Sequence, residues 1–312
     1  MNPAWSVIFL TTLIGAGQGL FLAIAGVDAA TRLGMIAPVA ADFYVTGSFV
    51  SLLLLTCGLG ASFLHLGHPE RAWRAIAMWR TSWLSREVIV LPAFMASVAA
   101  YGYAHAQGLS CAAWIALAGV LLCIALFVCT SMIYICLKFL QEWHTPLTLV
   151  NFVLLGSASG ALLAAALASA AWPKIAACLA VAAGVLTAAG ALTRSMSLAR
   201  NALLRSKSTA QSATGIANPK LAQKAQGAMG GSFNTREFFH GRTRQVVTGV
   251  KWFFLLATFA LPLVLIVLAL GNGAMHWLAV ACGVQHAGLL AERWFFFAQA
   301  RHPQNLYYQA IS

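Results

Sequence analysis

The sequence contains few charged residues: 8% of its 312 residues are charged, whereas 61% are hydrophobic. A soluble domain carries roughly a quarter charged residues, so this chain lacks the polar groups that cover a globular surface. This scarcity of charge excludes a soluble enzyme, a coiled coil and a disordered protein. Acidic residues are the rarest, with 7 Asp and Glu against 19 Lys and Arg. In a chain this apolar, the basic excess indicates an integral membrane protein rather than one that binds nucleic acid.

The sequence also lacks the motifs that hold metal ions. Its seven cysteines include no Cys-x-x-Cys pair, so we expect free thiols and no iron–sulfur cluster in this chain. No His-Glu-x-x-His motif, phosphate loop or serine triad is present. A haem is a weaker alternative, because a b-type haem commonly needs two facing histidines. His286 has no partner at its depth, whereas His105 and His276 could pair near the outer surface.

Eight apolar segments are long enough to cross a bilayer, which requires about 20 residues per helix. Gly15, Gly17 and Gly19, and the small residues of the fifth and sixth segments, offer faces for close helix packing. We therefore expect an all-α polytopic protein, an eight-helix transmembrane bundle that forms one membrane domain over residues 1–312. The predicted spans are 4–27, 42–65, 86–106, 112–137, 147–170, 174–193, 247–270 and 274–298.

The basic residues lie almost entirely on one side of the predicted bundle. With an even number of spans, both termini and the connections after spans two, four and six share a side, which carries 17 of the 19 Lys and Arg. Only Arg32 and Lys174 lie opposite, and the ratio is still 7 to 2 without the basic residues from Arg194 to Lys251. The positive-inside rule therefore places both termini, the 193–246 loop and the 299–312 tail in the cytoplasm, with the chain in a bacterial inner membrane.

Two of the cytoplasmic segments offer surfaces for a partner. The middle of the 193–246 loop has no hydrophobic period and cannot build a core alone, so it either faces lipid headgroups or docks a soluble protein. The segment from Glu292 to Tyr308 is strongly aromatic. Contact with a partner protein and anchoring at the membrane interface both explain that composition.

Ionisable residues near the membrane mark candidate functional sites. The richest cluster joins the second and third spans and contains His65, Arg71, Trp83, Arg86 and Glu87. The short connection is expected to bring an imidazole, a carboxyl group and guanidinium groups together at the edge of the hydrocarbon. A quinone needs this combination, because its tail partitions into lipid while its carbonyls accept hydrogen bonds. Its reduction also takes up two protons, which histidine and glutamate can supply.

Structural roles explain the same residues without a ligand. His65 can be a polar residue at a helix end, and the helix dipole can stabilise Glu87 two residues after an N-capping Ser85. The arginines can set the topology and extend to lipid headgroups. Gln18, deep in the first span, fits an interhelical hydrogen bond better than a quinone contact.

Three stretches of the chain carry a family pattern. They are Pro3–Gly19, His65-Leu-Gly-His-Pro-Glu-Arg-Ala-Trp-Arg74 with Ser82-Trp-Leu-Ser-Arg-Glu87, and Glu292–Tyr307. The chain resembles, end to end, the membrane anchor subunits of the dimethyl sulfoxide reductase type, within the polysulfide-reductase-like group. Within that family it is most similar to the anchors of cytoplasmic, quinone-linked sulfite dehydrogenases.

The resemblance implies an anchor without haem or metal of its own. It implies an iron–sulfur subunit with 4Fe–4S clusters, docked on the cytoplasmic face, and a molybdopterin catalytic subunit beyond it. The anchor would bind ubiquinone or menaquinone and pass electrons between the clusters and the quinone pool, without turning over substrate alone. The family's quinone-site roles fall on His65 and Glu87, and we extend them to Arg71, Trp83 and Arg86 by proximity.

The cytoplasmic basic face favours sulfite oxidation as the reaction of the complex. An anchor of a dimethyl sulfoxide reductase, which oxidises quinol, is the nearest alternative, because an anchor transmits electrons in either direction. A haem-b cytochrome subunit and a secondary transporter are alternatives from other classes. A transporter usually has internal repeats, and none is evident here.

Overall fold

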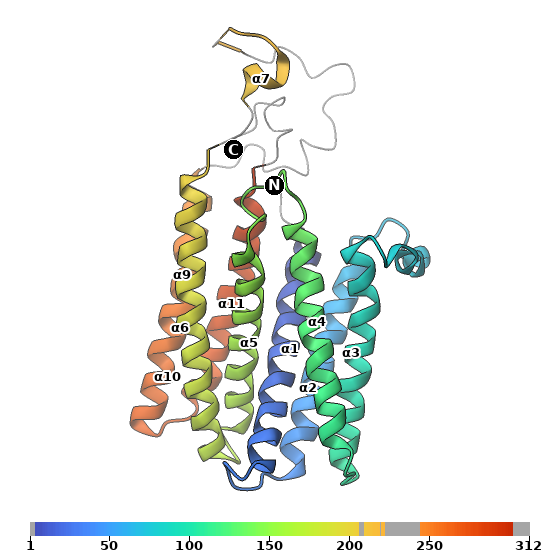
Figure 1. The fold of residues 1–312 in the computed structure, drawn as a ribbon. Coiled ribbons are helices and arrows are strands. Elements are labelled where there is room, and N and C mark those ends of the chain that lie inside the picture. Colours follow the sequence, from blue (N-terminus) through green and yellow to red (C-terminus); the bar gives the residue numbers. More distant parts are fainter. Residues whose placement is uncertain (1–3, 206–208, 219, 222–243, 302–312) are drawn as a thin grey trace.

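The computed structural model describes residues 4–205, 209–218, 220–221 and 244–301 (Figure 1). These residues form helices and connecting turns, with no β-strand among them, and the all-α prediction is confirmed. Seven helical segments are long and apolar enough to cross a membrane. They are α1 (Trp5–Arg32), α2 (Ala41–Phe63), α3 (Trp83–Ala106), α4 (Ala112–Ile135), α5 (Pro146–Ala168), α6 (Pro173–Leu203) and Gln245–Asn272.

The seventh segment consists of three consecutive helical elements, and an eighth helix follows it. The three are α9 (Arg244–Leu255), a π-helical turn η2 (Leu256–Ala260) and α10 (Leu261–Asn272). The eighth helix, α11 (Trp277–Ala298), falls short of the apolarity of a span, since Gln285, His286, Glu292 and Arg293 lie along it. Two short elements complete the described part of the chain: the 3-10 helix η1 (Pro69–Met78) and α7 (Ala210–Thr214).

The long helices run side by side, and the connections gather at two ends (Figure 1). The first turn of α1, the last turn of α11, η1 and α7 lie at one end, which we call the basic end. The connections 33–40, 107–111, 169–172 and 273–276 lie at the opposite end. Both described ends of the chain therefore lie at the same end of the bundle.

Local sequence signals explain where several helices begin and end. The side chain of Ser82 accepts a hydrogen bond from Ser85 N, and Thr145 caps α5 in the same manner. Pro146 occupies a first-turn position, where a missing N–H has no cost. Gly273, at φ +67°, ends α10 in the left-handed region, which glycine adopts without strain.

The predicted 193–246 loop needs one correction. Helix α6 does not end at 193 but continues to Leu203, so the first eleven residues of that segment are helical. Arg194 and Ser197 on this extension are buried in the bundle, which explains why it stays helical. Residues 222–243 of the loop, and residues 302–312 of the predicted cytoplasmic tail, lie outside the described part of the chain.

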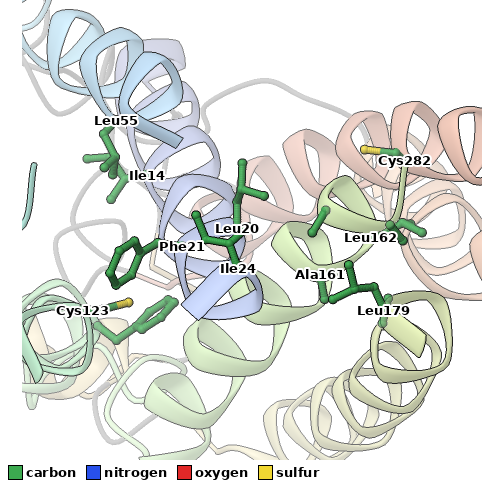
Figure 2. Packing of buried hydrophobic residues seen from close by; sticks show 14 of the residues in the cluster. Ile14, Leu20, Phe21, Ile24, Leu55, Cys123, Ala161, Leu162, Leu179 and Cys282 are labelled. Carbon is green, nitrogen blue, oxygen red and sulfur yellow. The ribbon is translucent and has the colours of Figure 1, made fainter. Parts of the chain in front are cut away.

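Helix α1 lies between other helices and packs against α2, α4, α5 and α11. Figure 2 shows Ile14, Leu20, Phe21 and Ile24 of α1 among side chains of its neighbours. Lipid tails are as apolar as these side chains, so close van der Waals packing, rather than escape from water, holds such helices together. The interior of the bundle is accordingly formed by small residues and interlocking aliphatic and aromatic groups.

Candidate functional site

A cavity inside the bundle gathers buried polar side chains near the basic end. Its volume is about 20 Å³, which is room for about one water molecule. Its walls come from α1, α3, α4, α5 and α11. We call it the central cavity, and its polar lining includes Thr11, Thr12, Gln18, Glu87, Thr130 and Arg293.

Glycines bring α1 and α5 together beside the central cavity. A Cβ atom at Gly19 would lie 2.0 Å from the carbonyl oxygen of Gly156, and one at Gly160 would lie 2.0 Å from the carbonyl carbon of Gly19. Such separations exclude any side chain at either position. Gly15 and Gly156 also line the cavity, so the backbones of both helices form part of its wall. Two Gly-x-x-x-Gly patterns, one on each helix, produce this approach.

Gln18 joins α1 to α4. Its amide nitrogen donates to the carbonyl oxygen of Cys123 at 3.0 Å, and the side chain is buried. The prediction of an interhelical hydrogen bond is therefore confirmed. Because Gln18 also lines the central cavity, it has a structural contact and a place at the candidate site.

Glu87 is the carboxyl group of the central cavity. It lies on the second turn of α3, is buried, and accepts a hydrogen bond from Thr130 on α4. The interpretation that Ser85 caps this helix is wrong, since Ser82 is the N-cap and α3 begins at Trp83. Glu87 thus lies beyond the first helical turn and faces the interior of the bundle, where a carboxyl group is a functional-site candidate.

Arg293 is the cationic group of the central cavity. Its guanidinium carbon lies 3.9 Å from the centre of the Phe152 ring, and its Nε lies 3.4 Å from a carboxyl oxygen of Glu292. The other oxygen of Glu292 lies 2.7 Å from Nε of Arg194, which α6 supplies. Three buried charged residues therefore form a row, Arg194, Glu292 and Arg293, and Arg293 is the member that lines the central cavity.

A second cavity lies next to the central one, because Phe152 and Arg293 line both. Its volume is about 10 Å³, and its other polar lining residues include Glu142 and Arg194. Aromatic rings surround the neighbouring helix ends at the basic end. Tyr134, Trp143, Phe152, Phe296 and Phe297 pack against one another, and Trp143 donates a hydrogen bond to the carbonyl oxygen of Phe296 at 2.9 Å.

This aromatic packing corrects the expectation for the C-terminal segment. Phe295, Phe296 and Phe297 are buried against other helices of the same chain, so they do not form a surface for a partner or for lipid. The cause is that α11 continues through Ala298 inside the bundle. The part of the segment from 302 to 308 lies outside the described residues.

The five predicted site residues divide into two groups. Glu87 lines the central cavity, whereas His65 and Arg71 are exposed beyond the end of α2. Nε of Arg71 lies 3.6 Å from Oε1 of Glu70, which is also exposed. Trp83 and Arg86 stack on each other at the start of α3, with the guanidinium carbon 4.2 Å from the ring centre. Figure 1 shows why the groups separate: the η1 connection extends outward beside α3, away from the interior that Glu87 faces.

A separate buried polar cluster lies at the opposite end of the bundle. Asp28 of α1 is 2.9 Å from Nε of Arg32 and 3.5 Å from Nε2 of His105, and the His105 ring stacks on Tyr44. His105 is therefore held by α1 and α2 rather than facing His276, which lies next to Trp277. Within the described ranges, no three His, Cys, Asp or Glu residues come close enough to hold a metal ion.

Sequence reasoning missed Thr130, Arg194, Glu292 and Arg293 as members of the site. The sequence pattern assigns Arg194 to a cytoplasmic loop and Glu292 to an aromatic surface segment. A signal was present, because adjacent charges at the end of an apolar run are unusual inside a membrane. Thr130 carried no signal, since threonine is common in membrane helices.

Two comparisons with known proteins agree on the family. A family model described as "DMSO reductase anchor subunit (DmsC)" matches residues 1–222, which include Gln18, Glu87 and Thr130. A sulfite dehydrogenase subunit of Allochromatium vinosum is 51% identical, in an alignment that covers the whole of both chains. The chain therefore belongs to the family of DMSO reductase anchor subunits.

Proposed function

We propose that this chain is the quinone-reactive membrane anchor of a sulfite-oxidising molybdopterin complex. The observation that carries the proposal is the central cavity, in which Glu87 and Arg293 face the interior of an otherwise apolar bundle. The relative named as a sulfite dehydrogenase subunit, with its full-length alignment, supports sulfite as the substrate of the complex. The sulfite itself would be oxidised in a partner subunit.

The lining of the central cavity suits the chemistry of a quinone head group. Gln18 offers its amide group and Thr12 a buried hydroxyl group, which has no partner in the described part of the chain, as hydrogen-bond donors to carbonyl oxygens. Phe127 and Phe152 offer ring faces. Quinone reduction takes up two electrons and two protons, and a carboxyl group such as Glu87 can relay protons. The cavity holds about one water molecule, so a quinone head group would enter only if these side chains move aside.

Electrons would reach the quinone from a partner at the basic end. Glu87 lies four residues from the start of α3 and Arg293 five from the end of α11, so both lie about 6 to 8 Å inside the helix ends. An iron–sulfur subunit on this end would bring its clusters close to the cavity, with the molybdopterin subunit beyond it. The excess of Lys and Arg supports a basic end on the cytoplasmic side of a bacterial inner membrane.

The whole chain acts, in this proposal, as one eight-helix anchor domain. Helix α11 supplies the eighth crossing, because it packs against α1, α5, α9 and α10 along its length. Its charged pair, Glu292 and Arg293, is buried against protein rather than lipid. Polar groups inside a membrane are tolerated in that situation.

The exposed residues of the predicted cluster receive a different role from Glu87. His65, Arg71, Trp83 and Arg86 lie around the connection between α2 and α3 at the basic end. We propose that they form the outer part of the quinone site, where the head group passes between lipid and cavity and where His65 exchanges protons with water. Glu87 and Arg293 form the inner part.

The test uses membranes from cells that co-express this chain with its partner subunits. Sulfite-driven reduction of a ubiquinone analogue is compared in wild type, Glu87→Gln, His65→Ala and, as a matched control, Asp42→Asn, whose carboxyl group is exposed at the opposite end. We expect a loss of about 10²-fold in quinone turnover for Glu87→Gln, typical of a lost proton relay. Sulfite oxidation with a soluble acceptor that takes electrons from the partner should be unchanged.

The outcomes separate the parts of the proposal. Full quinone turnover in Glu87→Gln would refute the central cavity as the quinone site. Full turnover in His65→Ala would refute the role of the exposed residues as the outer part of that site. Wild-type membranes without sulfite activity would refute sulfite as the substrate and direct the same assay to dimethyl sulfoxide with reduced quinone.

A further inference from the structure

The row of Arg194, Glu292 and Arg293 contains two positive charges and one negative charge. Their exposed fractions are 2%, 1% and 5%, so water does not compensate the difference. Glu292 uses one oxygen for each arginine. An ion pair of Arg194 with Glu292 would already be neutral, and a second buried guanidinium adds a large desolvation cost.

The position of Arg293 shows where its charge acts. Among the described lining residues of the central cavity, Arg293 is the cation and Glu87 the carboxyl group. Glu142 lines the second cavity together with Arg293 but not the central one, and no ion pair of Glu142 with either arginine occurs among the described residues. The ring of Phe152 lies against the guanidinium group and restricts its orientation. A positive charge is therefore fixed at the wall of the cavity in surroundings of low dielectric.

We infer that Arg293 binds the quinone oxygen that becomes negatively charged during reduction, and that Glu292 and Arg194 position it. This inference rests on the proposed function, since it requires a quinone in the central cavity. Arginine suits this role because its guanidinium group donates several hydrogen bonds in a fixed plane and stays charged.

The charge balance of the reaction explains why such a group is needed. Two electrons arrive from the partner's clusters, and two protons arrive through ionisable groups, which converts the two carbonyl oxygens into hydroxyl groups. An oxygen that has gained charge before its proton arrives is costly in an apolar bundle. A preorganised cation lowers that cost most where water is excluded. Glu87, which also lines the cavity, then relays a proton to the quinone, whereas Arg293 stabilises the negative charge.

The row also explains how Arg293 keeps its place. Glu292 is the neighbouring residue on α11, and Arg194 of α6 holds its other oxygen. Arg194 thus holds the carboxyl group of Glu292 in place, and Glu292 in turn orients Arg293. Arg194 and Glu292 are positioning residues, and Arg293 is the residue that would touch the quinone.

The experiment measures preference for an anionic ligand in the assembled complex. Inhibition of sulfite-driven ubiquinone-analogue reduction is titrated with two alkylated naphthoquinones: a 2-hydroxy compound, which is an anion at neutral pH, and its neutral 2-methoxy counterpart. The variants are Arg293→Gln and Arg293→Lys, with Arg32→Gln as the matched control, since Arg32 pairs with Asp28 outside the cavity. Co-purification of the subunits checks assembly.

We expect the wild type to bind the anion about tenfold more tightly than the neutral compound, the value of one charge-assisted hydrogen bond. Arg293→Lys and Arg32→Gln should keep a preference, and Arg293→Gln should lose it together with about 10²-fold in quinone turnover. Equal affinities in the wild type, or a preference that survives in Arg293→Gln, would overturn the inference. If Arg293→Gln fails to assemble, equal affinities of the wild type for the two compounds would still overturn the inference. If neither compound inhibits the wild type while sulfite oxidation proceeds, the proposed quinone site itself fails.

Discussion

Replacing Gly19 with alanine should force α1 and α5 apart. The added methyl carbon would lie 2.0 Å from the carbonyl oxygen of Gly156 and 2.9 Å from Cα of Ser157. Both neighbours are backbone atoms, so no side-chain rotation relieves the overlap. An ordinary contact begins near 3.4 Å, which requires the helices to separate by about 1.4 Å. Because Gly15 and Gly156 line the central cavity, the same movement changes the shape of the site.

The expected destabilisation follows from overpacking, which costs typically about 1–3 kcal/mol in a packed core. Thermal unfolding of the purified complex should show a lower midpoint, roughly 2–4 °C for each kcal/mol. Gly26→Ala is the control on the same helix, because a methyl group there has no neighbour within 4 Å. We expect its midpoint to equal or exceed that of the wild type, because alanine is the better helix former. Equal midpoints for Gly19→Ala and Gly26→Ala would refute the close approach of α1 and α5.

Two further substitutions test the buried polar groups. Glu292→Gln leaves Arg194 and Arg293 as buried charges without a carboxylate, so we expect a loss of about 3–5 kcal/mol; immunoblots of membranes and thermal unfolding should both show less folded anchor, and a wild-type midpoint would contradict the ion pairs. Thr130→Val removes the hydrogen bond donated to Glu87 at nearly constant shape, with an expected loss of about 1 kcal/mol. Quinone turnover should fall less than in Glu87→Gln, and unchanged stability and turnover together would exclude the hydrogen bond.

The positions of the long helices could be predicted from the sequence because they depend on long apolar runs. Predicted spans such as 112–137 and 147–170 agree closely with α4 and α5. Helix α4 ends at the connection between the two helices, and Pro146 sets the start of α5. The hydrogen bond of Gln18 was also predictable, since a polar amide in an apolar helix must find a partner on another helix.

The composition of the site was harder to predict, because it depends on how each helix is rotated about its axis. His65 and Glu87 lie near the two ends of the connection between α2 and α3, but only Glu87 points into the bundle. Hydropathy does not report rotation when a helix is apolar on all sides. The pairing of Arg194 with Glu292 joins residues about a hundred positions apart, and no local pattern connects them.

The π-helical turn between α9 and α10 has a consequence for relatives of this chain. The carbonyl oxygen of Thr258 in this turn accepts a hydrogen bond from Gln285 at 3.2 Å, and Gly288 leaves no room for a side chain against it. A π-helical turn holds one residue more than an α-helical turn, so the residues on either side of it keep the faces that a regular helix one residue shorter would give them. Ile266 and Ala269 would therefore stay buried if one residue of Leu256–Ala260 were removed. A single-residue gap in this stretch marks a relative in which this turn is α-helical while the last two helices pack in the same way.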